Sequence, residues 1–213
     1  MIGGKGSPNA LPFDALLFDF DGVLADTERV HHAAWNEVLK PLGIQFTWPE
    51  YIKQCVGVAD PKVAERLALP NAATVVARKQ QIFREGLERN PPFLPETLEL
   101  LRKLAASYRM AVVSSSFRTE ILPCIERAGL LAYFEMVICG NDVQNLKPAP
   151  DPYLLAVERL GVRNPLVIED SDSGVAAGKA AGLEVLRVSG PDRMAEELLS
   201  ALADFGNKIA KTP

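Results

Sequence analysis

The sequence of 213 residues is poor in cysteine and in long apolar runs. Its three cysteines, Cys55, Cys124 and Cys139, lie far apart and form neither a zinc-binding spacing nor a redox pair. Each has apolar neighbours, which predicts buried thiols in a reducing compartment. No apolar run approaches the roughly 18 residues that a membrane span requires, so we expect no membrane partner. Residues 1–12 contain one lysine and no apolar stretch, which predicts a flexible N-terminal tail rather than a secretory signal, and a cytoplasmic protein.

An excess of positive charge is missing as well. The chain has 23 lysines and arginines against 27 aspartates and glutamates, for a formal net charge of -4. Because backbone binding depends on clustered positive charge, we expect no nucleic-acid partner. A small anionic substrate remains compatible with this balance, since a few local donors and a metal ion override the net charge. The hydrophobic share of 48% and the charged share of 23% are typical of a globular protein, which we expect to be a monomer.

Five short apolar runs, each followed by polar residues or glycine, alternate along the chain with segments of helical spacing. The runs are residues 13–18, 110–113, 136–139, 166–168 and 185–188. Apolar residues three and four positions apart predict helices around residues 98–105, 121–128, 154–160 and 175–180. This alternation predicts an α/β protein with a doubly wound, Rossmann-like parallel sheet and helices on both of its faces.

One long interval, from Thr27 to Pro91, contains no strand-like run. Its spacing predicts helices near residues 30–39, from Asp60, and near 72–89. We therefore expect an inserted α-helical cap subdomain at residues 25–91 and an α/β core at residues 13–24 and 92–213. Gly22–Leu24 and Pro91–Pro92 are the expected hinges. Because ligands of open α/β sheets bind beyond the carboxyl ends of the strands, an insertion that leaves from this edge should cover the site as a lid.

Polar side chains follow the predicted strands at their carboxyl ends. They are Asp19 and Asp21, then Ser114, Ser115 and Ser116, then Glu169 and Asp170, with Lys147 in a loop ahead of a helix. Parallel strands bring such residues to one edge, where several carboxylates repel one another unless a cation joins them. Carboxylate oxygens suit Mg²⁺, and a lysine and a serine hydroxyl are natural donors to a phosphate. A carboxylate in this setting can attack phosphorus, and a second can transfer the proton.

Four segments carry a family resemblance. The segments 19–27 (DFDGVLADT), 113–116 (VSSS), 147–153 (KPAPDPY) and 168–174 (IEDSDSG) resemble, in this order, the four motifs of the haloacid dehalogenase superfamily, in its phosphotransferase branch. The chain is most similar to the β-phosphoglucomutase-like group, which includes many phosphatases with helical caps. The dehalogenating branch lacks the second aspartate, so Asp21 speaks against dehalogenation.

The resemblance implies a role for each motif residue. Asp19 is the expected nucleophile and a Mg²⁺ ligand, and Asp21 the acid/base, with its backbone carbonyl on the metal. Ser114, Ser115 and Lys147 are expected to hold the phosphoryl group, and Asp170 and Glu169 to bind Mg²⁺, the latter directly or through water.

The expected function is that of a Mg²⁺-dependent phosphatase that hydrolyses a small phosphorylated metabolite, such as a sugar or polyol phosphate, through an aspartyl phosphate. The alternatives are a sugar-phosphate mutase and, in another class, a non-catalytic regulator that binds a phosphorylated metabolite.

Three residues are weaker candidates for substrate contact. His31 either reaches toward Asp21 or the substrate, or packs inside the cap. Lys79 either faces the site or is an exposed helical charge, and Arg118 either contacts substrate or belongs only to the first turn of a helix. The mutases carry an arginine after a Gly-Val-Ser segment, whereas residues 57–62 here read GVADPK. The missing arginine speaks against the mutase. Asp172, in the fourth motif, is an extra carboxylate that either tunes the metal ion or interacts with the N-terminus of a helix.

Overall fold

The computed structural model of the protein describes residues 11–56, 58, 60–89 and 91–210, so most of the predicted tail, residues 1–10, lies outside the described residues. Five parallel strands form one sheet with the order β3-β2-β1-β4-β5. In chain order the strands are β1 (Ala15–Phe18), β2 (Arg109–Val113), β3 (Met136–Ile138), β4 (Pro165–Glu169) and β5 (Glu184–Arg187). The chain starts at the central strand and builds the sheet first to one side and then to the other, which confirms the predicted doubly wound topology.

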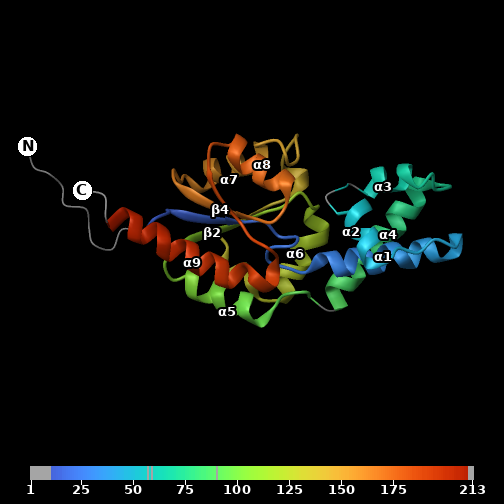
Figure 1. The fold of residues 1–213 in the computed structure, drawn as a ribbon, viewed down its shortest axis with the longest axis horizontal. Coiled ribbons are helices and arrows are strands. Elements are labelled where there is room, and N and C mark those ends of the chain that lie inside the picture. Colours follow the sequence, from blue (N-terminus) through green and yellow to red (C-terminus); the bar gives the residue numbers. More distant parts are fainter. Residues whose placement is uncertain (1–10, 57, 59, 90, 211–213) are drawn as a thin grey trace, which may run out of the picture.

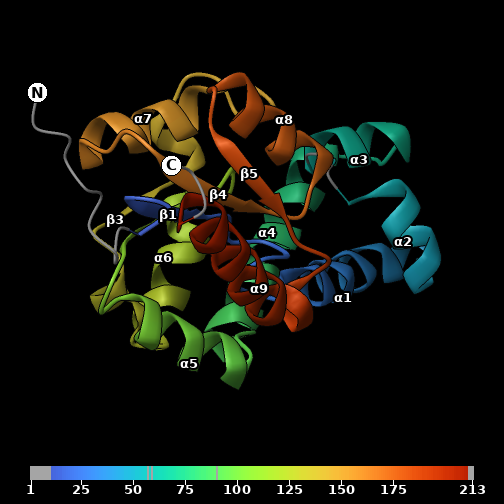
Figure 2. The same ribbon diagram turned by 60° about the vertical axis from the view of Figure 1, so that its left-hand side comes forward.

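Helices cover both faces of this sheet (Figures 1 and 2). On one face lie α5 (Pro95–Leu104), α6 (Arg118–Arg127) and α9 (Pro191–Ala210), and on the other lie α7 (Asp151–Leu160) and α8 (Asp172–Ala180). The central strand β1 is buried along its whole length because alternate side chains point to opposite faces. Leu16 and Phe18 pack with α5, α6 and α9, and Leu17 packs with α7 and α8.

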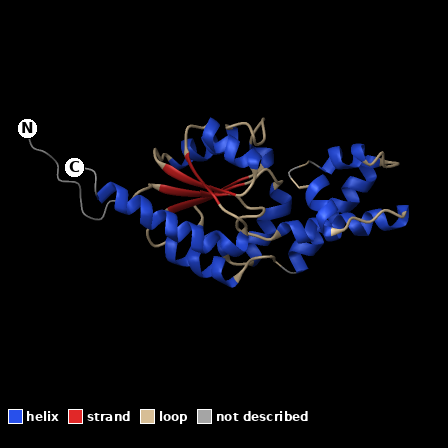
Figure 3. Ribbon diagram, viewed as in Figure 1, coloured by secondary structure: helices blue, strands red, loops and turns tan. Residues whose placement is uncertain are grey.

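A second group of helices lies beside the sheet (Figures 1 and 3). It contains α1 (Thr27–Leu39), α2 (Trp48–Gln54), α3 (Asp60–Arg66) and α4 (Ala72–Arg89), and we call it the helical cap. The cap has an apolar cluster of its own around Trp35, Leu39 and Tyr51. Phe83 and Leu87, late in α4, belong instead to the cluster of the sheet, so this end of α4 packs against the core.

The chain enters and leaves the cap along two adjacent segments. The backbone N–H of Asp26 donates to the carbonyl of Pro92 over 3.0 Å, and an isolated antiparallel bridge joins Ala25 to Phe93. Val23 and Leu24, two residues of the first predicted hinge, have no exposed surface.

Several smaller expectations can be compared with the structure. The three cysteines are free and buried, as predicted. Within the described residues, no helix combines the length and the apolar character that crossing a lipid bilayer demands. The sequence analysis missed α2, which has only seven residues, and α9. The signal for α9 was present, because Met194, Leu198 and Leu202 repeat every four residues behind Pro191.

Replacement of Leu198 by alanine should lower the free energy of unfolding by about 2–5 kcal/mol, because this side chain is fully buried in α9, which packs on α5. Its neighbour Leu199 is 52% exposed, so Leu199→Ala should change the free energy of unfolding by no more than about 0.5 kcal/mol. Urea unfolding of the two variants measures both values, and equal losses would contradict the packing of α9.

Candidate active site

The ends of three neighbouring strands bring the predicted polar residues together. Asp19 follows β1, Ser114 follows β2, and Glu169 is the last residue of β4. The N–H of Asp19 donates to the carbonyl of Ile168, and that of Ser114 to Ile138, each over 3.0 Å. These bonds continue the hydrogen-bond ladder of the parallel sheet by one residue. The sheet therefore fixes the backbone positions of Asp19 and Ser114.

Lys147 connects the three strand ends. Its ammonium donates to Oδ1 of Asp19 and to Oε1 of Glu169, each over 2.6 Å, and to the carbonyl of Val113 over 2.8 Å. These contacts use all three protons of the ammonium. Burial disfavours its positive charge, but Asp19, Tyr153 and Glu169 together hold the pKa of Lys147 well above its ordinary value. Lys147 therefore remains charged and ties the nucleophile candidate to the sheet.

Glu169 is held in place by donors on both carboxylate oxygens. Oε1 accepts from Lys147 and from the hydroxyl of Tyr153 at 2.8 Å. Oε2 accepts from the backbone of Asp170 at 3.1 Å and from the hydroxyl of Ser171 at 3.1 Å. Its side chain has no exposed surface. A direct bond to a cation would have to replace some of these contacts, so the geometry favours a role for Glu169 in orienting Lys147.

The cluster carries more negative than positive charge. Asp19, Glu169 and Asp170 each offer a carboxylate oxygen, and these atoms lie within 4.8 Å of one another. Burial raises the pKa of Asp19 well above its ordinary value, although the charge of Lys147 opposes this shift. Burial and the charge of Glu169 raise the pKa of Asp170 to about 6. One lysine leaves this charge uncompensated, and the hard oxygen donors are of the kind that Mg²⁺ prefers, so the residues present fit such an ion.

Two glycines make room for these carboxylates. Gly22 has a φ of 77°, which L-residues with a side chain rarely adopt, and a Cβ there would lie 2.2 Å from Oδ2 of Asp170. A Cβ on Gly174, in the first turn of α8, would lie 1.7 Å from Oε1 of Glu169. Any larger residue at either position would displace a carboxylate of the cluster.

Asp21 is held by hydroxyl groups from both the cap and the core. Oδ1 accepts from Thr27, the first residue of α1, at 2.6 Å, and Oδ2 accepts from Ser116 at 2.7 Å and from Ser114 at 3.3 Å. Ser115 lies half-buried in the same loop. Sequence reasoning missed Thr27 and Ser116 as partners of Asp21. Ser114 does not cap the helix that follows it, because α6 begins at Arg118 with Phe117 at its N-cap position.

The structure separates the weaker candidates. Lys79 is 1% exposed, so its interpretation as an exposed helical charge is wrong. Its ammonium donates to Nδ1 of His31 over 2.7 Å and to both carboxylate oxygens of Asp60. Arg118 lies apart from these residues and pairs with Asp142 at 2.6 Å. The side chain of Asp172 is 92% exposed and pairs with Arg187, which favours the helix-terminal interpretation.

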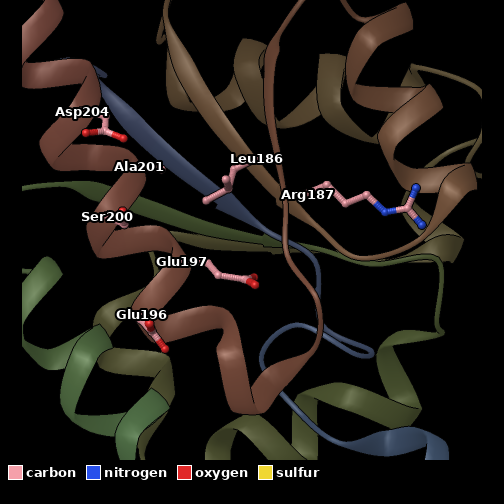
Figure 4. Close-up of a pocket in the computed structure, with 7 residues that line it drawn as sticks. All are labelled: Leu186, Arg187, Glu196, Glu197, Ser200, Ala201 and Asp204. Atoms are coloured by element: carbon pink, nitrogen blue, oxygen red, sulfur yellow. The ribbon is translucent and has the colours of Figure 1, made fainter.

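Two hollows of the described surface lie away from this site. One pocket of about 410 Å³ lies between β5 and α9 (Figure 4), lined by Arg187 of the strand and by acidic residues of the helix such as Glu196 and Glu197. Another is lined by Glu85, Glu88, Arg89 and Arg127. Asp19, Lys147, Glu169 and Asp170 line neither pocket. The chemistry of these side chains, rather than the shape of the surface, therefore identifies the site.

Comparison with known proteins identifies the family of the chain. The family model described as haloacid dehalogenase-like hydrolase matches residues 16–188. A protein of Drosophila melanogaster named probable pseudouridine-5'-phosphatase is 36% identical over 211 residues, which cover 89% of this chain and 90% of the relative. A phosphorylated carbohydrates phosphatase of Thermotoga maritima is 34% identical over 80% of this chain and 82% of its own. The crystal structure of CbbY from Rhodobacter sphaeroides in complex with phosphate has a TM-score of 0.71 and 27% identity, with 84% of this chain and 87% of that chain covered.

Replacement of Gly174 by alanine should lower the free energy of unfolding by about 1–3 kcal/mol, because the new methyl group overlaps the Glu169 carboxylate and must push it from Lys147 and Tyr153. Gly206→Ala in α9 is the matched control, since a Cβ there meets nothing within 4 Å. That change should raise the free energy of unfolding by up to about 1 kcal/mol, because alanine favours the helix. Thermal unfolding distinguishes the two, and a stabilised Gly174→Ala variant would contradict the tight seat of Glu169.

Proposed function

The chain belongs to the haloacid dehalogenase-like hydrolase family, and we propose that it is a Mg²⁺-dependent phosphatase of small phosphorylated metabolites. It is a hydrolase of phosphoric monoesters, as the names of its relatives indicate. The observation that carries the proposal is the strand-end cluster formed by Asp19, Lys147, Glu169 and Asp170. Oδ1 of Asp19 lies 2.6 Å from the ammonium of Lys147, and carboxylate oxygens of Asp19, Glu169 and Asp170 lie within 4.8 Å of one another. A sugar or polyol phosphate is the substrate class that we favour.

Asp19 and Asp170 are the side chains that would hold the metal ion, together with the backbone carbonyl of Asp21. When bound, Mg²⁺ supplies charge neutralisation that lets an anionic phosphoryl group approach anionic carboxylates. The excess of carboxylates over lysine in the cluster supports this requirement.

In the proposed reaction, Asp19 attacks phosphorus, forms an aspartyl phosphate and releases the substrate alcohol, to which Asp21 donates a proton. Water then attacks the aspartyl phosphate, Asp21 takes up a proton from it, and inorganic phosphate leaves as the Asp19 carboxylate is restored. Lys147 keeps Oδ1 of Asp19 in place, so we assign the attack to Oδ2. Ser114 and Ser115 belong to the loop that would hold the phosphoryl oxygens, and Ser114 also supports Asp21.

We also propose that the chain divides into a core of residues 13–24 and 92–213 and a cap of residues 25–91. The separate apolar cluster of the cap supports this division, and so does the pairing of Asp26 with Pro92 where the two connections meet. In this arrangement the cap excludes water from the site while the phosphoryl group is transferred.

A screen of phosphorylated sugars and polyols tests the proposal. With Mg²⁺, we expect release of inorganic phosphate from at least one of them, and we expect excess EDTA to abolish it. Calcium should substitute poorly, because its longer bonds and higher coordination number disturb in-line attack. Full activity in EDTA would show that the cluster works without a metal ion. Conversion of β-glucose 1-phosphate to glucose 6-phosphate, with a bisphosphate primer and little phosphate release, would identify a mutase instead.

Asp19→Asn should reduce turnover to background while the fold persists, because the amide keeps the volume of the carboxylate but cannot act as an anionic nucleophile. Asp172→Asn is the matched control, since it makes the same change at a carboxylate that is 92% exposed and pairs with Arg187. It should keep turnover within about a factor of two of the unmodified protein, as a surface change away from the site. Steady-state rates and thermal unfolding of both variants provide the measurement, and near-normal turnover by Asp19→Asn would exclude covalent catalysis at this residue.

A further inference from the structure

The buried cation of the cap, Lys79, is linked to the acid/base candidate Asp21 through two residues of α1, His31 and Thr27. Thr27 donates to Oδ1 of Asp21 over 2.6 Å, and His31, four residues later in α1, shares a helix face with Thr27. The ring of His31 stacks on Phe83 with centroids 3.7 Å apart, and its Nδ1 accepts from Lys79 over 2.7 Å. Lys79 therefore lies where a cap residue could meet the part of a substrate that is not transferred.

The ammonium of Lys79 is already fully engaged. Its three acceptors are Nδ1 of His31 at 2.7 Å and the two oxygens of Asp60 at 2.7 and 2.9 Å. An ammonium has three protons, so none remains for an anion on a substrate. Because lysine only donates, Nδ1 of His31 must be unprotonated, and burial followed by the charge of Lys79 holds the pKa of His31 well below its ordinary value. His31 is thus a neutral donor through Nε2.

Other cations near this part of the cap are engaged or turned away. Arg29 stacks on the ring of Trp48 at 3.7 Å, and Lys62 is exposed and pairs with Glu65 at 2.9 Å. Arg78 is exposed and precedes Lys79, so it points about 100° away around α4.

Two carboxyl groups of this part of the molecule, those of Glu28 and Glu120, have raised pKa values. Glu28, next to Thr27, accepts a hydrogen bond from the hydroxyl of Tyr51. Burial, opposed by that bond and assisted by the charge of Asp21, raises the pKa of Glu28 to about 7. Burial and the charge of Asp21 also raise the pKa of Glu120, at the start of α6.

We propose that Asp60, by neutralising Lys79, restricts the site to phosphate monoesters whose leaving group carries hydroxyl groups and no second anionic group. The proposal rests on the phosphatase function given above and names its substrate class. His31 and the pair formed by Glu28 and Tyr51 offer neutral donors and acceptors that suit hydroxyl groups. A second phosphate or a carboxylate would meet the carboxylate of Asp60, while the ammonium of Lys79 has no proton left to pair with it.

Two pairs of compounds that differ mainly in a second anionic group test this restriction. Fructose 1-phosphate is compared with fructose 1,6-bisphosphate, and glycerol 3-phosphate with 3-phosphoglycerate. For the unmodified protein with Mg²⁺, we expect kcat/KM to be on the order of tenfold or more higher for the member of each pair that has one anionic group. These members are fructose 1-phosphate and glycerol 3-phosphate.

Asp60→Asn removes the charge, keeps the volume and frees Lys79 to pair with an anion. This substitution should raise kcat/KM for the compound with two anionic groups, relative to the compound with one, by on the order of tenfold. The change should arise mainly from a lower KM for the compound with two anionic groups. Glu65→Gln is the matched control, because it removes one carboxylate charge from the same helix α3 at a side chain that is 70% exposed and does not contact Lys79. It should leave both ratios unchanged.

A binding experiment separates failure of this proposal from failure of the phosphatase function. The affinities of the same four compounds are measured by calorimetry with Mg²⁺ on Asp19→Asn protein, with and without Asp60→Asn. Weaker binding of the doubly anionic compounds, relieved by Asp60→Asn, supports the proposal even if none of the four is hydrolysed. Equal or tighter binding of the doubly anionic compounds to the protein with Asp60 intact overturns it, as does an unchanged ratio in the Asp60→Asn protein. Absence of hydrolysis of every phosphate ester in the wider screen would overturn the phosphatase function alone.

Discussion

The placement of Lys147 among the ends of β1, β2 and β4 is the constraint on which the rest of the site depends. With 4% of its side chain exposed, it bonds Asp19, Glu169 and the carbonyl of Val113 at once. Without this cation, two buried carboxylates would face each other with no compensating charge, at a cost of several kcal/mol. Lys147 cannot balance all the carboxylates that meet here, and the uncompensated charge of Asp19 and Asp170 is what makes a divalent cation fit. Lys147 thus stabilises the sheet edge but leaves part of its negative charge unbalanced.

The position of Asp21 depends on two parts of the molecule. Ser114 and Ser116 hold one carboxylate oxygen from the core, and Thr27, at the start of α1, holds the other. Since Thr27 is also the first residue of α1, a shift of α1 relative to the sheet would alter the hydrogen bonding of Asp21. The helical cap therefore contributes to the site through the geometry of the acid/base candidate.

The sequence was sufficient to predict what the parallel sheet dictates. Asp19, Ser114 and Glu169 follow or end apolar strands, and the carboxyl ends of parallel strands meet at one edge, so their proximity follows from the chain order alone. It was not sufficient for contacts that depend on how helices pack. Examples are the hydrogen bonds of Thr27 and Ser116 to Asp21 and of Tyr153 to Glu169. No helical or strand periodicity in the sequence relates the residues of these pairs. The burial of Lys79 could not be predicted either, because its partner Asp60 is 19 residues away on another helix.

Two buried lysines among the described residues, Lys147 and Lys79, show how a fold can assign opposite tasks to one residue type. Lys147 meets two carboxylates and leaves its surroundings negative, whereas Lys79 meets one carboxylate and a neutral imidazole, so its charge is balanced. A negative cluster at the strand ends attracts a cation, and with it a phosphoryl group. A balanced cluster in the cap attracts neither cations nor anions and leaves recognition to hydrogen bonds. The end of a substrate that carries the transferred phosphate and the end that does not therefore meet different electrostatic environments, although both are lined by lysine and acidic side chains.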